Sequence, residues 1–369
     1  MATATVDRIR EAALELFSRY WFESVSVAQI CRRAEVSNGV FYRYYRNKDT
    51  LFEHLLDDFL RRFGADLEGI RGGSRRERLS SFVATVSGAA RRYAGQVTMF
   101  REGQYRRPVY EERLRALYVV ALERVLGRTV SEAEYLFVLS GLRFIATRSL
   151  YHDVSMNSDL LQRIVEGGVF DGGRSAPLVA TPPAPEQLAA GDSGEALIEA
   201  GLRLLGKQEF YSVQVSDLAR EAGFSVGTFY KRFESKEHFL GEVVRIIGRR
   251  TRHYLSLHTA ATGSRLDREV LGMWNFLSYF GHHREYYDIV REAEFVVPGA
   301  VKEYYDAFER GYVGTLPGYP AEQRPLVANF LMGLSHYLGI EVLFSSRVED
   351  AGRLVDELGE LLADGIGES

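Results

Sequence analysis

Cysteine is almost absent from this chain, since Cys31 is the only one among 369 residues. A single cysteine excludes an intramolecular disulfide framework and a cysteine-rich zinc site. No uninterrupted apolar stretch reaches the roughly 18 residues that a transmembrane helix requires. Residues 1–10 also lack the apolar core of a signal peptide. We therefore expect a protein of the reducing cytoplasm that works without a membrane.

A strong excess of charge of one sign is missing too. The chain has 46 basic and 50 acidic residues, a net charge of −4, so bulk electrostatics does not indicate nucleic-acid binding. It has no glycine-rich phosphate loop and no plausible nucleophile elbow. His282, His283 and Glu285 suggest a metal site, but adjacent histidines point to different sides of a helix. We expect no enzymatic activity, no metal and no cofactor.

The chain does contain an internal repeat. Residues 24–52 align without gaps on residues 212–240, a shift of 188, and ten of the 29 positions are identical. Chance would match roughly one position in seventeen. Weaker similarity continues downstream, where residues 100–105 resemble residues 290–295 and Pro108 mirrors Pro298. The whole unit was therefore duplicated.

Glycine and proline separate the two copies between Gly167 and Gly194, a composition that cannot hold a regular helix or strand. Apolar residues recur at helical spacing elsewhere, and no convincing alternating strand pattern occurs, so we expect an all-α fold. The predicted domains are a first head at 1–64, a first body at 65–170, a linker at 171–193, a second head at 194–250 and a second body at 251–369.

Each copy begins with the pattern of a helix-turn-helix. In the first copy, Val27–Ala34 and Ser37–Tyr44 are two short predicted helices joined by a tight turn. The matching helices of the second copy are Val215–Ala222 and Ser225–Arg232. This geometry places the second helix of each pair in the major groove of DNA.

The segment Ser37–Asp49 resembles the signature of the TetR/AcrR family of repressors, and Ser225–Glu237 resembles it more closely still. The preceding residues Ile30–Val36 and Leu218–Phe224 also fit, so the resemblance covers about 45 residues in each copy. It implies an all-helical fold with a DNA-binding head. It also implies a larger helical body that binds a small effector and dimerises. We expect two tandem TetR-like units that form a pseudo-dimer.

The matched positions predict a division of labour on DNA. Serine N-caps and the opening lysines suit phosphate contacts, the tyrosines can donate their hydroxyls to phosphate, and the glycines permit close approach. Other side chains of the recognition helices would read bases and differ between the copies. The predicted DNA-binding residues are Ser26, Ser37, Asn38, Gly39, Val40, Tyr42, Arg43, Tyr44 and Lys48 in the first head, and Ser225, Val226, Gly227, Thr228, Tyr230, Lys231 and Lys236 in the second.

Local charge supports the first head more strongly than the second. Residues 32–48 carry a net charge of +4, residues 220–236 carry +2, and the tail 341–369 carries −6. Gln214 stands where the first copy has Ser26, which weakens the predicted helix cap. Glu221 and Glu234 replace Arg33 and Arg46, so we expect weaker phosphate binding by the second head.

The last two long helices of each body are predicted to pack into a four-helix interface within one chain. A true dimer of chains with four heads is the alternative. The helices concerned are Glu132–His152, Asp159–Val169, Ala321–Phe344 and Val348–Ala363. Because the heads differ, we expect an imperfectly palindromic operator.

Aromatic residues in the bodies predict an effector pocket, with ordinary core packing as the alternative. The candidate ligand-binding residues are Phe100, Tyr105, Trp274, Tyr279, Tyr287 and Phe295. The pairs Arg101-Glu102 and Arg291-Glu292 recur in both copies and would orient a polar group of a ligand or form internal salt bridges.

These patterns favour a sequence-specific regulator of transcription that binds double-stranded DNA in the cytoplasm, at the nucleoid. We expect a repressor that a small-molecule effector releases from its operator. The alternative is a protein-interaction module whose DNA-binding heads have degenerated. DNA binding would weaken steeply with salt through counterion release, whereas a hydrophobic protein contact would not.

Overall fold

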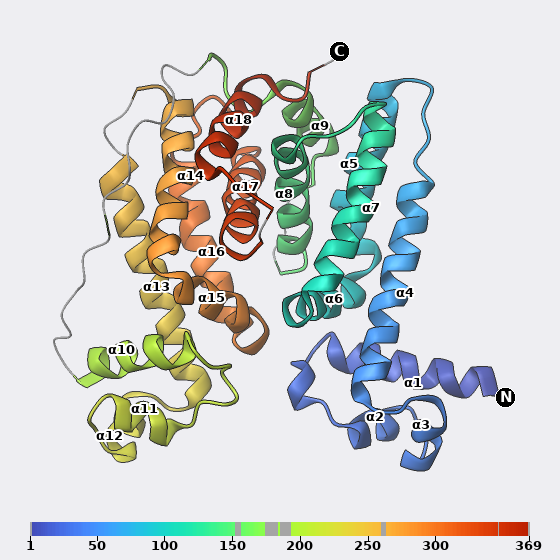
Figure 1. The fold of residues 1–369 in the computed structure, drawn as a ribbon, viewed down its shortest axis with the longest axis vertical. Coiled ribbons are helices and arrows are strands. Elements are labelled where there is room, and N and C mark those ends of the chain that lie inside the picture. The colour runs from blue at the N-terminus through green and yellow to red at the C-terminus, as the bar shows by residue number, and fades with distance from the viewer. Residues whose placement is uncertain are drawn as a thin grey trace. The chain divides into compact units, whose positions relative to one another are not determined.

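The computed structural model describes residues 2–151, 156–173, 184, 193–259, 263–345 and 347–367. Every regular element in these ranges is helical, which confirms the all-α prediction (Figure 1). Most of the predicted linker 171–193 and His152, the predicted end of one body helix, lie outside the described residues. Ser193 begins the first helix of the second copy.

The two copies repeat the same order of helices. Helices α6 and α15 each have 13 residues, and the paired short helices of the two heads each have seven. The first copy contains α1 (Ala2–Phe17), the 3-10 helix η1 (Phe22–Ser24), α2 (Val27–Arg33), α3 (Asn38–Tyr44), α4 (Lys48–Glu68), α5 (Arg75–Arg92), α6 (Ala94–Arg106), α7 (Pro108–Leu126), α8 (Glu132–Arg148) and α9 (Ser158–Gly167). The second contains α10 (Ser193–Leu205), α11 (Val215–Glu221), α12 (Val226–Arg232), α13 (Lys236–Thr259), α14 (Arg265–His282), α15 (Arg284–Val296), α16 (Pro298–Val313), α17 (Arg324–Phe344) and α18 (Ala351–Asp364).

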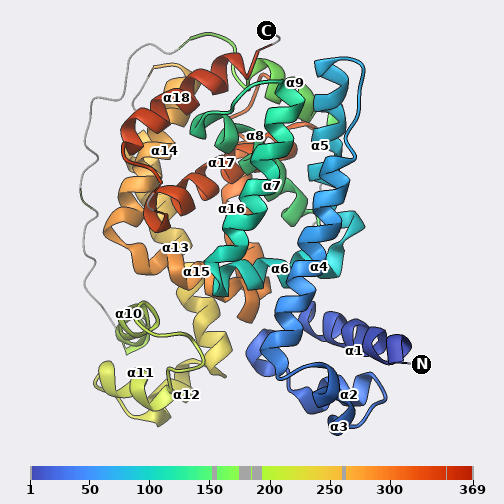
Figure 2. The same cartoon turned by 45° about the vertical axis from the view of Figure 1, so that its right-hand side comes forward.

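One long helix connects each head to its own body. Helix α4 contacts α1 in the first head and α6 and α7 in the first body, and α13 contacts α10 and then α14, α15 and α16. Figures 1 and 2 show both helices leaving their heads and continuing alongside the body helices. Helix α4 extends to Glu68, and Phe63, Gly64 and Leu67 in its last turns are all buried.

Compact units and repeat units do not coincide. One compact unit contains residues 1–130 and 145–162, and the other contains residues 131–144 and 163–369. Within the second unit the start of α8 packs on α17, where the rings of Phe137 and Phe330 lie 5.6 Å apart. A Cβ on Gly141 would lie only 2.2 Å from Phe330, so this contact requires glycine. The N–H group of Val169 also donates to the carbonyl of Leu362 at 2.7 Å.

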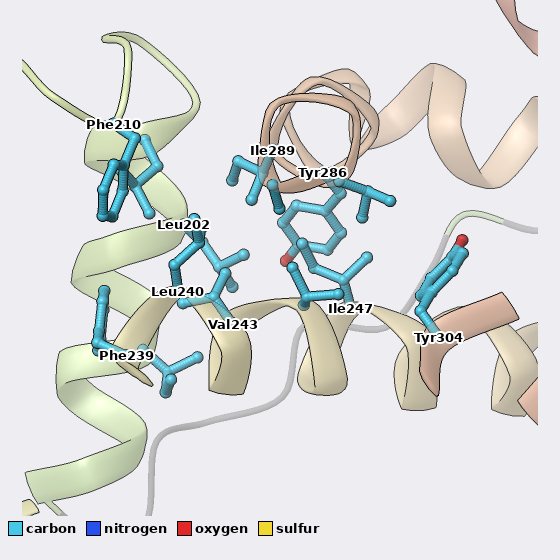
Figure 3. Close-up of a cluster of buried hydrophobic side chains, with 14 of the residues drawn as sticks. Leu202, Phe210, Phe239, Leu240, Val243, Ile247, Tyr286, Ile289 and Tyr304 are labelled. Carbon is cyan, nitrogen blue, oxygen red and sulfur yellow. The ribbon is translucent and has the colours of Figure 1, made fainter. Parts of the chain in front are cut away.

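A single apolar cluster extends from the second head into the second body. Figure 3 shows Leu202 of α10, Phe239 and Ile247 of α13, and Tyr286 of α15 within it. Fully burying a side chain of this size stabilises the fold by about 1.5–3 kcal/mol. Separating the head from the body would expose this cluster to water. The second head and the second body therefore share one apolar core.

Helix α17 is the most apolar long helix of the described residues. Its most apolar 18-residue segment has a mean hydropathy of 1.4, so by length and composition alone the helix could cross a membrane. In the structure 78% of this segment is buried within the fold. The helix contacts α14 and α16, and Phe330 and Leu334 are fully buried. Such burial on all sides accounts for the near absence of a polar face.

Candidate nucleic-acid interface

Serine side chains cap the short helices of the first head. Ser26 Oγ accepts a hydrogen bond from Gln29 N at 3.2 Å, and Ser37 Oγ accepts one from Val40 N at 3.4 Å. In the second head Ser225 Oγ accepts from Thr228 N at 3.2 Å. These three serines therefore fix the starts of α2, α3 and α12.

The second head starts its supporting helix differently. Gln214 replaces the capping serine, and the Asp217 carboxylate accepts a hydrogen bond from Gln214 N at 3.1 Å. This contact reproduces half of a capping box. The weaker cap expected from Gln214 is therefore partly offset by Asp217.

The turn between the two short helices has a left-handed residue at its first position. Gly223 has φ of 76°, and the equivalent Glu35 of the first head has φ of 53°. Glycine adopts this conformation without steric cost, whereas other residues lose about 1–2 kcal/mol. The first head therefore stores backbone strain at an exposed glutamate that the second head avoids.

Outward-facing side chains on α3 and α12 form the candidate DNA-facing surface. Tyr42 is 57% exposed and Tyr230 is 56% exposed, while the neighbouring Phe41 and Phe229 are fully buried. Phe41 packs with Tyr45, and Phe229 packs with Phe233, as the i,i+4 spacing predicts. The other predicted base-reading and helix-end positions are exposed or half-buried: Asn38, Val40, Arg43, Tyr44, Val226, Thr228 and Lys231.

The two recognition-helix glycines have no internal packing reason to be glycine. A Cβ on Gly39 would meet only Ser37 Oγ at 3.9 Å, and a Cβ on Gly227 would meet only Ser225 Oγ at 3.6 Å. Glycine in a helix costs about 1 kcal/mol relative to alanine. Both heads carry this cost at an exposed position, which is compatible with close approach of an external surface.

An ion pair joins the first two helices of each head with reversed polarity. Arg33 of α2 pairs with Glu15 of α1 at 2.6 Å, and Glu221 of α11 pairs with Arg203 of α10 at 2.8 Å. In the repeat, Glu15 is equivalent to Arg203 and Arg33 is equivalent to Glu221, so the two charges of the pair are exchanged between the copies. The replacement of Arg33 by Glu221 therefore preserves a contact within the head, which sequence reasoning from Arg33 alone missed.

The opening lysines of α4 and α13 face inward. Lys48 Nζ donates to the carbonyl of Phe22 at 2.7 Å and lies 4.0 Å from the centre of that ring. Lys236 Nζ donates to the carbonyls of Phe210 and Val213 at 2.8 and 2.9 Å. Burial lowers the pKa of both ammonium groups. Their predicted phosphate contacts gain no support from these positions, because both side chains fasten the preceding loop.

A buried carboxylate from each body holds the same loop from the other side. Glu102 Oε1 of α6 accepts a hydrogen bond from Phe22 N at 2.8 Å, and Glu292 Oε1 of α15 accepts one from Phe210 N at 2.8 Å. Burial raises the pKa of Glu102 to about 7. We call this arrangement, Lys48–Phe22–Glu102 and Lys236–Phe210–Glu292, the loop clamp. It gives the glutamates of the recurring Arg-Glu pairs a role in joining head and body.

The second body contains a cavity of about 720 Å³, bordered by α13, α14, α15, α16, α17 and the turn after α16. Apolar and aromatic side chains dominate its wall, together with four arginines and one glutamate. Such a volume and composition are typical of small-molecule sites.

Of the six predicted ligand-binding residues, only Tyr287 lines this cavity. Phe100 lies in the core of the first body, 4.8 Å from the ring of Phe59, and Tyr279 packs on Tyr254. Tyr105, Trp274 and Phe295 do not border the cavity either. Aromatic content alone could not separate wall from core. The arginines of α13 and α14 also line the cavity, and the sequence analysis did not identify them as candidates.

Histidine side chains near the end of α14 have ordinary partners. The His283 ring stacks on Tyr286 at 4.5 Å, and its Nδ1 lies 3.5 Å from a Glu285 oxygen. Within the described ranges, no group of three histidine, cysteine, aspartate or glutamate side chains is placed to hold a metal ion.

Comparison with known proteins matches both heads to one family. The model of the bacterial regulatory proteins of the tetR family matches residues 9–55 and 197–243. The Probable HTH-type transcriptional regulator YttP of Bacillus subtilis (strain 168) is 34% identical over 68 residues, which cover 18% of this chain. The match spans a third of the length of that curated relative.

Solved structures similar to this chain include two regulators named FadR. The fatty acid degradation regulator FadR of Bacillus halodurans has 17% identity and a TM-score of 0.39, covering 48% of this chain and 98% of its own. FadR of Bacillus subtilis, solved in complex with stearoyl-CoA, has 18% identity and a TM-score of 0.40, covering 46% and 98%. The family model therefore identifies two tetR-type helix-turn-helix domains in tandem within this chain, one in each copy of the repeat.

Proposed function

We propose that the protein is a cytoplasmic transcriptional repressor that binds double-stranded DNA through both heads. The observation that carries this proposal is the pair of family-matched heads, each with an outward-facing recognition helix. The exposed glycines at 39 and 227 support it, because they keep a helix-destabilising residue where no packing contact needs one.

In this proposal, phosphate and base contacts come from different residues of each recognition helix. The Tyr42 and Tyr230 hydroxyls and the capped helix starts at Ser37 and Ser225 would contact phosphates, with Ser26 assisting in the first head. Base edges would be read by Asn38, Val40 and Arg43 in the first head and by Val226, Thr228 and Lys231 in the second. Since these sets differ, the operator would have two unequal half-sites.

A pseudo-dimer within one chain is the assembly that we propose. It is supported by the contacts of the α8 start with α17 and of Val169 with Leu362, which place residues 131–144 and 163–169 of the first copy in the second compact unit. Light scattering tests this assembly. A mass near 41.7 kDa supports it, whereas twice that mass supports a dimer of chains with four heads.

We further propose that the cavity of the second body holds the effector and that α15 transmits its binding. Tyr287, Val290 and Arg291 of α15 line the cavity, and the next residue, Glu292, holds Phe210 in the head. A ligand that displaces α15 would therefore act directly on the loop clamp. By linkage, a ligand that favours one clamp geometry changes operator affinity by the same free energy as DNA changes ligand affinity.

Selection from a random duplex library with the full chain tests the DNA-binding proposal. Enrichment of two related but unequal half-sites supports two working heads. A single half-site would mean that the second head is degenerate, and a perfect palindrome would favour two chains that pair like heads. Affinity for the selected duplex should fall steeply with salt. No enrichment at any salt concentration would refute DNA binding and favour a protein-interaction module.

A further inference from the structure

The two bodies differ in how they fill the same position. Lys48 and Lys236 occupy equivalent positions at the starts of α4 and α13. With the two helices aligned from these lysines, Arg252 of the second copy is the equivalent of Gly64 in the first. The register of α7 with α16, set by Pro108 and Pro298, equates Leu117 with Ala307. In the first body, Leu117 Cδ2 lies 3.3 Å from the point where a Cβ of Gly64 would stand. Leucine therefore fills the space beside this glycine.

At two positions of the cavity wall the second body has a smaller residue than the first body has. Ala307 replaces Leu117 and Val290 replaces Phe100, and both smaller residues line the cavity. Phe100 is 2% exposed and packs against Phe59 in the first body. Protein interiors are normally close-packed. Two smaller side chains that border the same cavity would lower the stability of the fold if the cavity stayed empty.

Arg252 is the charged residue placed where the first body has glycine. It lines the cavity and lies 5.4 Å from the centre of the Phe308 ring. Among the described residues, no carboxylate lies within ion-pair distance of its guanidinium. Burial lowers the pKa of Arg252, so its charge is partly desolvated. Desolvating a cation without an anionic partner is unfavourable.

The other charges of the cavity wall have partners or face solvent. Glu269, the acidic residue of the wall, pairs with Arg265 at 2.8 Å and accepts a hydrogen bond from the Tyr312 hydroxyl at 2.8 Å. Arg291 lies 3.8 Å from a carboxylate oxygen of Asp288, and Arg268 is exposed. The wall therefore has an excess of positive charge that a cationic ligand would not tolerate.

We propose that the cavity binds one anionic amphiphile per chain, with Arg252 contacting the anionic group and the apolar wall enclosing the remainder. This inference rests on the proposed effector role of the cavity and specifies its ligand class. Guanidinium groups pair with carboxylates and phosphates through two parallel hydrogen bonds. Leu117 and Phe100 occupy the corresponding positions of the first body, so we expect the site in the second copy alone.

Calorimetry on the full chain without DNA tests the ligand class. Decanoate, decyl phosphate, 1-decanol and decyltrimethylammonium share one apolar chain and differ in the charge of the head group. We expect one site per chain, at which decanoate or decyl phosphate binds at least tenfold more tightly than decanol, while the cation does not bind. Equal binding of decanol and the anions, a stoichiometry of two, or no binding of any probe would overturn the proposal.

Two variants and a control locate the site. Arg252→Ala should weaken anion binding about 10- to 100-fold, the range for losing a charge-assisted hydrogen bond. Arg249→Ala, which removes an exposed arginine from the same helix outside the cavity, should leave it unchanged. Ala307→Leu restores the residue of the first body and should abolish binding while helicity is retained. If Arg252→Ala behaves like Arg249→Ala, or Ala307→Leu still binds the anion, the assignment is wrong.

DNA binding of the ligand-free chain is measured separately with the selected duplex. Retained anion binding with no DNA binding would refute the proposed repressor and leave the ligand class intact. Retained DNA binding with no anion binding would refute the ligand class alone.

Discussion

Replacing Glu102 by glutamine should stabilise the first copy above pH 7. Burial raises the Glu102 pKa from an ordinary 4.5 to about 7. A raised carboxyl pKa means that the folded state binds its proton more tightly, so this contribution to stability is present below pH 4.5 and is lost as the pH rises through 7. The change in pKa corresponds to roughly 3 kcal/mol.

Glutamine is uncharged and its carbonyl can still accept the Phe22 N–H hydrogen bond. A neutral acceptor forms a weaker bond than a carboxylate, by about 1 kcal/mol. We therefore expect Glu102→Gln to raise the free energy of unfolding by about 2 kcal/mol at pH 8 and to change it little at pH 5. Glu11→Gln, an exposed change on α1, should show no such difference.

Tryptophan fluorescence can report the first copy alone. The chain has two tryptophans, and Trp21 lies beside the loop clamp, so urea unfolding in a Trp274→Phe background monitors the first head. Equal or lower stability of Glu102→Gln at pH 8 would refute the reasoning. It would mean that Arg106 and Lys48 stabilise the ionised carboxylate more than burial penalises it.

Three further predictions concern the heads. Glu35→Gly should stabilise the first head by about 1 kcal/mol because glycine adopts the left-handed conformation without strain. Gly223→Ala should destabilise the second head for the same reason. If urea unfolding shows that both variants change the free energy of unfolding in the same direction, Glu35 is not strained. Gly39→Ala should raise the free energy of unfolding by about 1 kcal/mol in the same assay and lower DNA affinity in gel shifts. A variant that gains both stability and DNA affinity would show that Gly39 is not needed for close approach to DNA. Tyr42→Phe should leave stability unchanged and weaken binding about tenfold for every DNA sequence, so a sequence-dependent loss would assign Tyr42 to base reading.

Much of each head could be predicted because its signals are local. Ser37 caps the helix that begins at Asn38, and the i,i+4 pair Phe41 and Tyr45 packs inward. These patterns depend on residues within one or two helical turns, where helix geometry fixes which side chains meet. The order of helices was predictable for the same reason, and the repeat supplied it twice.

The loop clamp and the cavity depend on residues far apart in the chain. Phe22 and Glu102 are separated by 80 residues, and no spacing rule connects a backbone N–H group to such a partner. The cavity depends on side-chain sizes at positions 252, 290 and 307, which lie on three helices. Tyr287 borders the cavity, but aromatic content alone could not distinguish it from core residues such as Phe100.

The two copies keep some contacts unchanged and differ at others. The residues of the loop clamp are identical in both copies, although they connect different heads to different bodies. The ion pair between the first two head helices keeps its geometry while its charges are exchanged. At the cavity, by contrast, Arg252 and Ala307 stand at the repeat positions of Gly64 and Leu117, so the two copies differ there in both size and charge. A fixed connection between head and body, with a changed interior in one body, is what a single sensor controlling two heads would require.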